Sequence, residues 1–114
     1  IVSGANFVAR GFAGQPDHLA ELIVQGIRWP GFAFLEVLSP CVTFRPEQSA
    51  WKKSVRLDAF SASADRGIAT AIAMNDDGFG LGVLFKGERA AAISRGDATM
   101  TFPNIEKQFA VGHR

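Results

Sequence analysis

Residues 31–38 place the strongest single constraint on the fold of this chain. Their sequence, GFAFLEVL, is almost continuously apolar and carries one charged residue, Glu36. A strand with one side facing water alternates apolar and polar residues, whereas a strand buried on both faces reads as a continuous apolar run and belongs to a parallel sheet flanked by helices. We therefore expect residues 31–38 to form a central strand of a parallel sheet.

The segment before this strand predicts how the strand is connected. Residues 17–28 have helical periodicity, because four aliphatic side chains recur at spacings of three and four: Leu19, Leu22, Ile23 and Ile27. Pro16 suits the first helical turn, and Pro30-Gly31 would end the helix. Residues 6–10 read as an earlier buried strand, and a loop with two glycines and a proline follows over residues 11–16. Strand, helix and strand with short connections predict a right-handed βαβ unit and an α/β fold.

Cys41 is the residue with the clearest chemical potential. It follows the predicted strand directly, and the carboxyl edge of an open α/β sheet is where ligands and cofactors bind. As the single cysteine of the chain, it cannot form an internal disulfide or complete a multi-cysteine zinc site. Two interpretations stay open on the residues alone: a metal-binding thiolate, or a buried cysteine acting as a small hydrophobe, which is the more common case.

The rest of the chain predicts a smaller set of elements. We expect a polar connection over residues 45–54, an alanine-rich helix over residues 62–74 with Ser61 or Ser63 as its cap, and a short strand over residues 81–86. The run Asn75-Asp76-Asp77-Gly78 would end the helix in a turn. Residues 96–114 show no clear pattern, and chain ends of this kind are often poorly ordered.

Composition argues against several classes of partner. The net charge of +1, with scattered basic residues, gives no strong attraction to nucleic acid or another polyanion. No apolar run approaches the roughly 20 residues that cross a membrane, so no membrane partner is expected. No signal peptide is visible either, and the default location is the cytoplasm.

Four weaker motifs favour a structural interpretation over a functional one. Cys41 could serve as a nucleophile with His18 or His113 as its base, but nothing in the sequence places either histidine beside it. The glycines of residues 78–82 precede a strand, whereas phosphate loops follow one and open a helix. Trp51-Lys52-Lys53 is a weak nucleic-acid motif, and we expect Trp51 to pack on a neighbour. Asp76-Asp77 could bind a cation, but adjacent carboxylates in a turn are usually solvated.

Several motifs, taken in order, resemble the beta subunits of 2-oxoacid:ferredoxin oxidoreductases. They are Gly4-Ala5-Asn6-Phe7-Val8-Ala9-Arg10-Gly11-Phe12, Gly31-Phe32-Ala33-Phe34, Leu38-Ser39-Pro40-Cys41-Val42-Thr43-Phe44, Trp51-Lys52-Lys53, Ala64-Asp65-Arg66 and Leu81-Gly82-Val83-Leu84-Phe85. The Ser-Pro-Cys-Val-Thr-Phe run is the specific one, and the resemblance covers roughly residues 1–90.

The resemblance implies an enzyme subunit with three cofactors: thiamine diphosphate, Mg²⁺ and one [4Fe–4S] cluster. It implies oxidative decarboxylation of a 2-oxoacid, with 2-oxoglutarate favoured over pyruvate, transfer of the acyl group to coenzyme A and of electrons to ferredoxin. An alpha subunit would be the obligate partner. In the family, the Ser-Pro-Cys motif supplies the fourth cysteine of the cluster, so the resemblance assigns Cys41 as a metal ligand.

The resemblance also implies that functional parts lie before Ile1. The chain has no Cys-Pro-Gly-Cys motif for the other cluster ligands and no Gly-Asp-Gly-Asp segment for Mg²⁺ and the diphosphate. We therefore assign no catalytic or thiamine-binding residue, and we expect the isolated chain to be inactive. Residues 1–48 would be the C-terminal part of a doubly wound thiamine-diphosphate-binding domain, residues 49–92 an irregular C-terminal extension, and residues 93–114 a tail. The alternative is an inactive orphan α/β module that binds a partner subunit.

Overall fold

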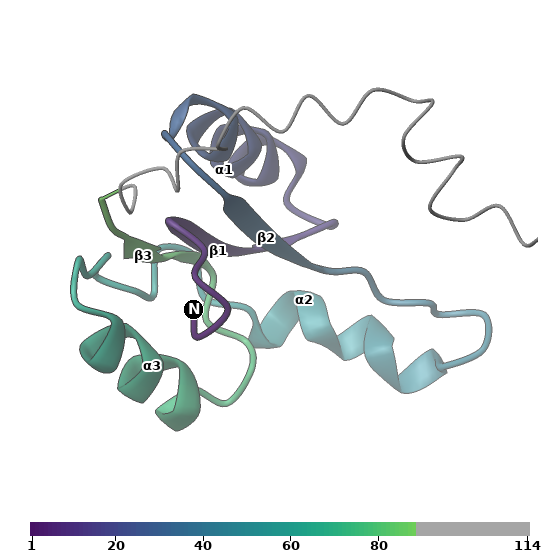
Figure 1. Ribbon diagram of the computed structural model, residues 1–114. Coiled ribbons are helices and arrows are strands. Elements are labelled where there is room, and N and C mark those ends of the chain that lie inside the picture. The colour runs from purple at the N-terminus through teal and green to yellow at the C-terminus, as the bar shows by residue number, and fades with distance from the viewer. Residues whose placement is uncertain (89–114) are drawn as a thin grey trace, which may run out of the picture.

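A three-stranded mixed sheet organises residues 1–88, the part of the chain that this computed structural model describes (Figure 1). The strand order is β2-β1-β3, with β1 at Phe7–Phe12, β2 at Ala33–Leu38 and β3 at Gly82–Lys86. β1 and β2 run parallel, in a register that pairs Phe7 with Ala33 and Phe12 with Leu38, whereas β1 and β3 run antiparallel. The predicted α/β fold is confirmed.

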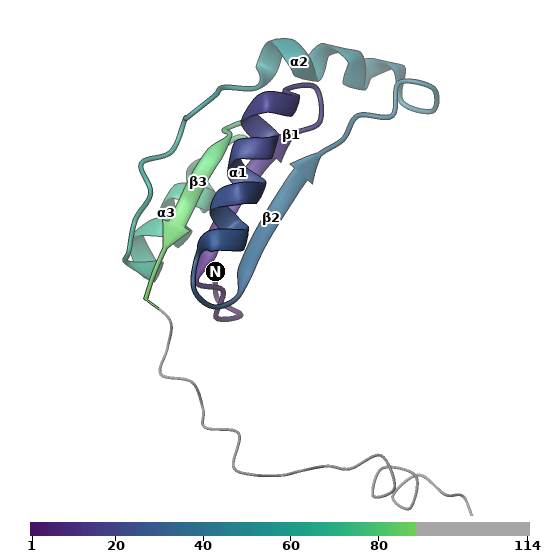
Figure 2. The ribbon, with the colours of Figure 1, turned by 90° about the horizontal axis from the view of Figure 1, so that it is seen from above.

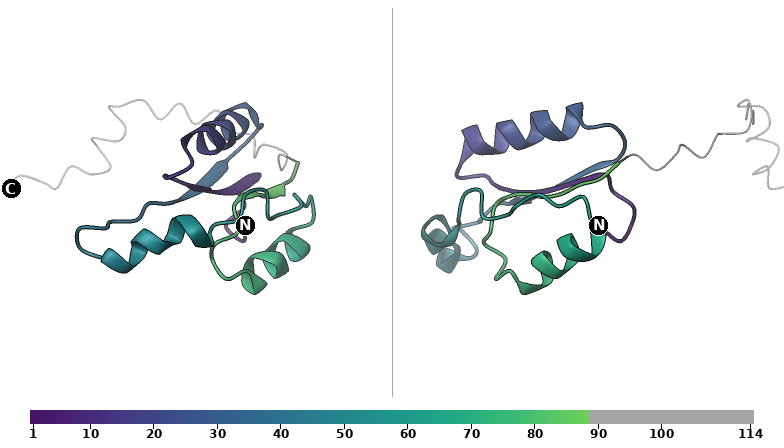
Figure 3. Two further views of the ribbon diagram at one scale, coloured as in Figure 1. Left: turned by 180° about the vertical axis from the view of Figure 1, so that it is seen from behind. Right: turned by 90° about the vertical axis from the view of Figure 1, so that its left-hand side faces the viewer.

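Helix α1, Pro16–Arg28, connects the two parallel strands and confirms the predicted βαβ unit. It begins with Pro16, carries Asp17 in its first turn and ends at Arg28, and Figure 2 shows it lying along the sheet over β1. The helix α3, Arg66–Asn75, covers the opposite face of the same sheet, as Figure 3 shows. The sheet is therefore a middle layer between two helices.

The core has one half on each face of β1, because successive strand residues point to opposite faces. On the α1 side, Phe7 and Ala9 pack with Leu22. On the α3 side, the buried residues are Ala5, Val8, Ala69, Leu84 and Phe85. β1 contributes to both halves and is therefore the strand whose side chains are most completely buried.

The predicted central position of residues 31–38 is wrong for the described sheet. β2 lies at the edge, none of its residues is fully buried, and Phe34 and Val37 are about half exposed (51% and 42%). The apolar run correctly predicted a strand. An apolar pattern indicates which side chains a strand can bury, but it does not indicate which other strands pair with it. The central strand is β1, whose flanking neighbours come from distant parts of the sequence.

Three further predictions need correction. Residues 45–54 are not a plain connection, because they contain a 3₁₀ helix, Pro46–Ala50, followed by α2, Trp51–Ser54. α3 starts at Arg66 and not at residue 62, and its cap is Asp65, whose carboxylate accepts a hydrogen bond from the Ile68 amide at 2.9 Å. Ser63 instead accepts one from the Asp65 amide at 3.0 Å and so shapes the turn before the helix.

After residue 48, α3 and β3 correspond to the predicted helix and strand, and α2 is an additional element that was not predicted. β1 is also longer than predicted and includes Gly11 and Phe12. The proposed tail at residues 93–114 lies outside the described residues. Among residues 1–88, no helix combines the length and the apolar character that a membrane crossing requires.

Candidate functional site

Cys41 lies just beyond the edge at which the two parallel strands end. β1 ends at Phe12 and β2 at Leu38, and the Ala13 amide donates a hydrogen bond to the Leu38 carbonyl at 2.9 Å, so the two strand ends are joined. Cys41 follows Leu38 by three residues and is an exposed free cysteine. Its sulfur is not sealed in the core, as it would be if the residue served only as a small hydrophobe.

The backbone of Cys41 is held on both sides. Its amide donates to the side-chain oxygen Oε1 of Gln48 at 2.7 Å, and its carbonyl accepts from the Arg45 amide at 2.8 Å. Gln48 belongs to the 3₁₀ helix that continues into α2, and Trp51 of α2 packs edge-on against Phe79 with ring centroids 5.8 Å apart. These contacts fix the position of the cysteine backbone and leave the thiol group accessible.

A shallow groove of about 250 Å³ lies next to Cys41 at this edge. Its lining includes Phe12, Pro40, Val42 and Gln48, with Lys52 as its one cation. Val42 and Phe44, on either side of Thr43, are 54% and 84% exposed. The lining of this groove is thus mostly apolar, and the residues on either side of Cys41 in the sequence belong to it, although Cys41 itself does not.

One thiolate cannot complete a metal site by itself. No group of three metal-ligating side chains occurs within residues 1–88. A [4Fe–4S] cluster is held by four cysteine thiolates, so Cys41 fits this cofactor as a single contributed ligand. Its exposure and its two backbone hydrogen bonds are compatible with such a contribution.

A buried ionic network on the α3 side was not foreseen from the sequence. Arg10 of β1 donates from Nε to Glu36 of β2 and from Nη1 to Asp76, both at 2.7 Å. Burial alone lowers the pKa of Arg10, but the hydrogen bonds and charges of the two carboxylates outweigh it and raise that pKa above its ordinary value. The Asp76 side chain is only 7% exposed and also accepts from Arg56 at 3.1 Å. Through Arg10 of β1, the network joins β2 to the turn that follows α3, and its role is structural.

Asp77 is exposed and forms an ion pair with Arg56, which also contacts Asp76. Arg56 donates to the two carboxylate oxygens of Asp77 at 2.8 and 2.9 Å, and the Phe79 amide donates at 3.0 Å. The hydrogen bond from Arg56, supported by the Phe79 amide, lowers the pKa of Asp77 to about 2. The expectation of simply solvated carboxylates at positions 76 and 77 is therefore wrong, since a guanidinium group occupies both.

The remaining motifs take structural roles. His18 Nε2 lies 3.4 Å from Asp58 Oδ1, while His113 lies outside the described residues. The amides of Gly78 and Gly80 donate to Asp76, at 2.8 and 3.3 Å, so a carboxylate of the chain itself occupies them. Trp51 packs on a neighbour as predicted.

Sequence comparison relates this chain to proteins of known class. No family model matches it. A 2-oxoacid:ferredoxin oxidoreductase beta subunit from Sulfolobus sp is 50% identical over 44 residues, which are 39% of this chain and 14% of that protein. The beta subunit from Saccharolobus solfataricus is 48% identical over 44 residues, which are again 39% of this chain and 14% of that protein. This chain is related to 2-oxoacid:ferredoxin oxidoreductase beta subunits.

The relationship of the chain to these beta subunits extends to a solved structure. The 2-oxoglutarate:ferredoxin oxidoreductase from Magnetococcus marinus, with 2-oxoglutarate, coenzyme A and succinyl-CoA bound, matches with a TM-score of 0.67 and 30% identity. The match covers 79% of this chain and 32% of that one. The 2-oxoglutarate synthase subunit KorB from Methanocaldococcus jannaschii is 46% identical over 44 residues, 16% of its length. The match thus spans about a seventh of the Sulfolobus and Saccharolobus beta subunits.

Proposed function

We propose that this chain is the part of a ferredoxin-dependent 2-oxoacid oxidoreductase beta subunit that supplies one thiolate, that of Cys41, to a [4Fe–4S] cluster. The observation that carries this proposal is the accessible thiol at the shared carboxyl edge of two parallel strands, in a chain related to such beta subunits. The other three ligands would come from polypeptide outside residues 1–88. When bound, the cluster would carry electrons to ferredoxin.

The reaction that we propose for the complete enzyme is oxidative decarboxylation of 2-oxoglutarate with transfer of the acyl group to coenzyme A. Two relatives support this substrate: the KorB subunit, named as a 2-oxoglutarate synthase subunit, and the Magnetococcus marinus enzyme with 2-oxoglutarate and coenzyme A bound. Thiamine diphosphate and Mg²⁺ would supply the decarboxylation chemistry. Residues 1–88 offer Cys41 to the cluster and contain no residue that we assign to the thiamine cofactor.

We further propose that residues 1–48 are the last part of a doubly wound thiamine-diphosphate-binding domain and that residues 49–92 extend it. The parallel β1–α1–β2 unit, with α1 on one face of its sheet, supports the first assignment. The antiparallel addition of β3 to β1 suits an extension that returns to the domain. An alpha subunit and ferredoxin would be the partners, in a reducing compartment such as the cytoplasm, where an exposed free thiol persists.

A chimera tests the cluster ligand. Residues 1–88 would replace the matching region of the Saccharolobus solfataricus beta subunit, which is then produced with its alpha subunit. We expect iron, acid-labile sulfide and 2-oxoglutarate-dependent ferredoxin reduction in the chimera and their loss in its Cys41→Ser variant. Val24→Ala is the control, because it shortens a partly exposed apolar side chain on α1 without removing a thiolate. A Cys41→Ser protein with undiminished iron and sulfide would contradict the ligand assignment.

A further inference from the structure

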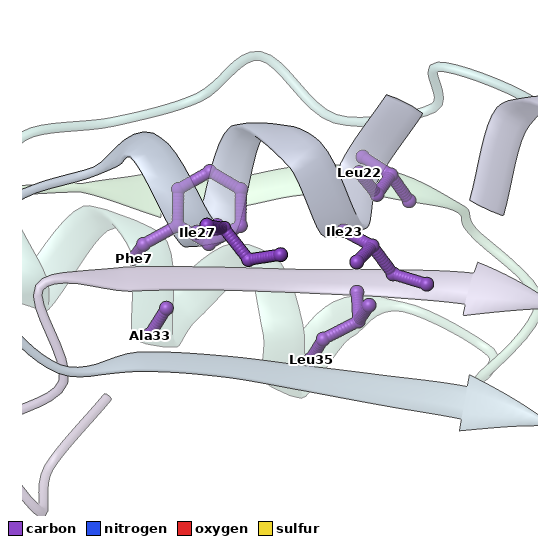
Figure 4. A pocket seen from close by; sticks show the side chains of 7 residues that line it. Phe7, Leu22, Ile23, Ile27, Ala33 and Leu35 are labelled. Atoms are coloured by element: carbon purple, nitrogen blue, oxygen red, sulfur yellow. The ribbon is translucent and has the colours of Figure 1, made fainter. Parts of the chain in front are cut away.

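Ionisable groups of the described chain gather in the turn after α3 and not in its apolar grooves. The groove of about 230 Å³ between α1 and β2 is lined by apolar residues such as Ile23, Ile27 and Leu35 (Figure 4). In the turn, by contrast, the carboxylates at positions 76 and 77 meet two guanidinium groups and several backbone amides. A covalent change in residues 1–88 is therefore to be sought in this turn.

Asp77 and Gly78 form the one aspartate–glycine pair of the 114-residue sequence. Such pairs isomerise readily, because glycine has no side chain to hinder attack by its backbone nitrogen on the carboxyl carbon of the preceding aspartate. The new bond between nitrogen and carbon closes a succinimide ring, while the amide proton leaves with the carboxyl hydroxyl as water. Water then opens the ring at either carbonyl. Opening at the original backbone carbonyl gives isoaspartate, in which the main chain runs through the former side chain.

The backbone conformation of the turn favours glycine at this position. Gly78 has a φ of 90°, which L side chains rarely adopt, although a Cβ there would meet nothing within 4 Å. A side chain that would hinder the reaction is thus disfavoured by the backbone and not by a lack of space. Protection of the pair must therefore come from the groups around it.

Arg56 holds the carboxyl group of Asp77 in its unreactive form. Ring closure needs the neutral carboxyl, because the carboxylate has no hydroxyl to lose and repels a nucleophile. Arg56 donates to both oxygens at 2.8 and 2.9 Å, and the Phe79 amide adds a third hydrogen bond at 3.0 Å. These contacts lower the pKa of Asp77 to about 2, so the neutral form is rare in the folded chain at mildly acidic pH.

Asp76 restrains the attacking amide. The Gly78 amide donates to Asp76 Oδ2 at 2.8 Å, and this carboxylate is 7% exposed and bound by Arg10 at 2.7 Å. The amide must lose its proton to attack, and a neighbouring carboxylate opposes that loss, since it accepts the proton's hydrogen bond and repels a second negative charge. The two reacting groups are thus restrained by two different side chains.

We propose that Asp77-Gly78 is a latent isomerisation site that contacts with Arg56 and Asp76 keep unreactive in the folded chain. The contacts lie within the chain and need no cofactor, so this inference is independent of the proposed function. Without them, the exposed turn would convert slowly to isoaspartate with no change in mass.

Isomerisation here would act on the segment that supports Cys41. Isoaspartate adds a backbone carbon between residues 77 and 78 and so displaces Phe79, whose ring packs against Trp51 with centroids 5.8 Å apart. Trp51 directly follows the 3₁₀ helix whose Gln48 accepts a hydrogen bond from the Cys41 amide. The protected turn therefore preserves a contact on which the position of the cysteine backbone depends.

Slow incubation of the full 114-residue chain tests the proposal. Folded chain and chain unfolded in urea would be held at the same mildly acidic pH, below the melting temperature, and isoaspartate at residue 77 measured by peptide mapping and enzymatic methylation. We expect formation to be at least about tenfold slower in the folded chain, since the neutral fraction falls tenfold for each unit by which the pKa is lowered. Arg56→Gln should raise the folded rate by a similar factor. Arg45→Gln, which removes an exposed arginine paired with Glu47, is the matched control and should not.

Three results would overturn the proposal. Equal rates in the folded and unfolded natural sequence would show that the fold gives no protection, and this comparison needs no variant. An Arg56→Gln chain that stays folded by its urea midpoint, yet isomerises no faster, would remove Arg56 from the account. An Arg45→Gln chain as fast as Arg56→Gln would show that any lost arginine has this effect. Cys41→Ser should isomerise as slowly as the natural sequence, which separates this test from that of the cluster ligand.

Discussion

Arg10 and Asp76 form an ion pair of 2.7 Å across 66 residues of sequence, with side chains that are only 13% and 7% exposed. Asp76 follows the last residue of α3, and Arg10 lies on β1, so the pair ties the end of that helix to the central strand. Four donors converge on the carboxylate: Arg10, Arg56 and the amides of Gly78 and Gly80.

Removal of this carboxylate should destabilise the chain measurably. We expect Asp76→Ala to lower the free energy of unfolding by about 2–3 kcal/mol, because a buried guanidinium loses one partner and two amides lose their acceptor. Asp77→Ala, which removes an exposed carboxylate from the same turn, should have a much smaller effect. Urea unfolding of both variants measures the difference, and equal losses would show that burial of Asp76 has no energetic role.

The pair of Arg56 and Asp77 predicts a pH dependence. The pKa of Asp77 is lowered from 3.8 to about 2 in the folded chain, first by the hydrogen bond from Arg56. A carboxyl with a depressed folded pKa contributes stability that is complete above its unfolded pKa and is lost as the pH falls through the folded one. We therefore expect this contribution to vanish between about pH 4 and pH 2. An NMR titration of the Asp77 carboxyl checks the value, and Arg56→Gln should return it toward 3.8, whereas Arg45→Gln should not.

The buried side chain of Asn6 connects two segments by hydrogen bonds at the amino ends of the parallel strands. Its side chain accepts from the Phe32 amide at 3.0 Å and donates to the Glu88 carbonyl at 2.7 Å, so it joins the start of β2 to the end of β3. We expect Asn6→Leu to cost about 1–3 kcal/mol, since two partly buried backbone groups lose the hydrogen bonds of a buried side chain. Thermal unfolding would reveal it, and an unchanged melting temperature would show that water replaces the amide without cost.

Asn6 leaves no room for a side chain at Gly31, and Gly4 is a matched position where a side chain would have room. Both glycines have positive φ, at 106° and 89°, but a Cβ on Gly31 would lie 2.3 Å from Asn6 Oδ1, whereas one on Gly4 would meet nothing within 4 Å. Gly4→Ala should thus show only the conformational cost of about 1–2 kcal/mol. Gly31→Ala should lose more, by about 1–3 kcal/mol of crowding. Equal effects would mean that Asn6 can move aside.

The accessibility of Cys41 gives a chemical prediction. Because its thiol is exposed while its backbone is held by Gln48 and Arg45, the folded chain should react with a thiol reagent almost as fast as the unfolded chain. Labelling of native and urea-denatured protein compares the two rates. Strong protection in the native state would show that the sulfur is covered.

Local patterns predicted the elements well, and nonlocal contacts explain what they missed. Helix α1 begins within one residue of its predicted start. The helical spacing of Leu19, Leu22, Ile23 and Ile27, with Pro16 before them, lies within the segment itself and therefore predicts it. The position of Cys41 after β2 follows from the same reasoning.

The place of β2 in the sheet could not be predicted in this way. Whether an apolar strand lies at the centre or the edge depends on which distant segments pair with it, and β3 joined β1 and left β2 outside. The cap of α3 was misplaced for a different reason: Ser63 and Asp65 are both good caps, and the backbone pairing of Ser63 with β3 commits Ser63 to another role. The partners of Arg10 lie 26 and 66 residues away and leave no local pattern.

The hydrogen-bonded side chain of Asn6 and the thiol of Cys41 lie at opposite ends of β1 and β2. The Asn6 hydrogen bonds therefore lie where the strands begin, and the exposed thiol lies beyond the point where they end. Residues 39–50 could therefore be redesigned without changing the hydrogen bonds of Asn6. Substitutions at Asn6 or Gly31 that lower the stability of the fold should, by the same separation, leave the reactivity of the thiol in the folded chain unchanged.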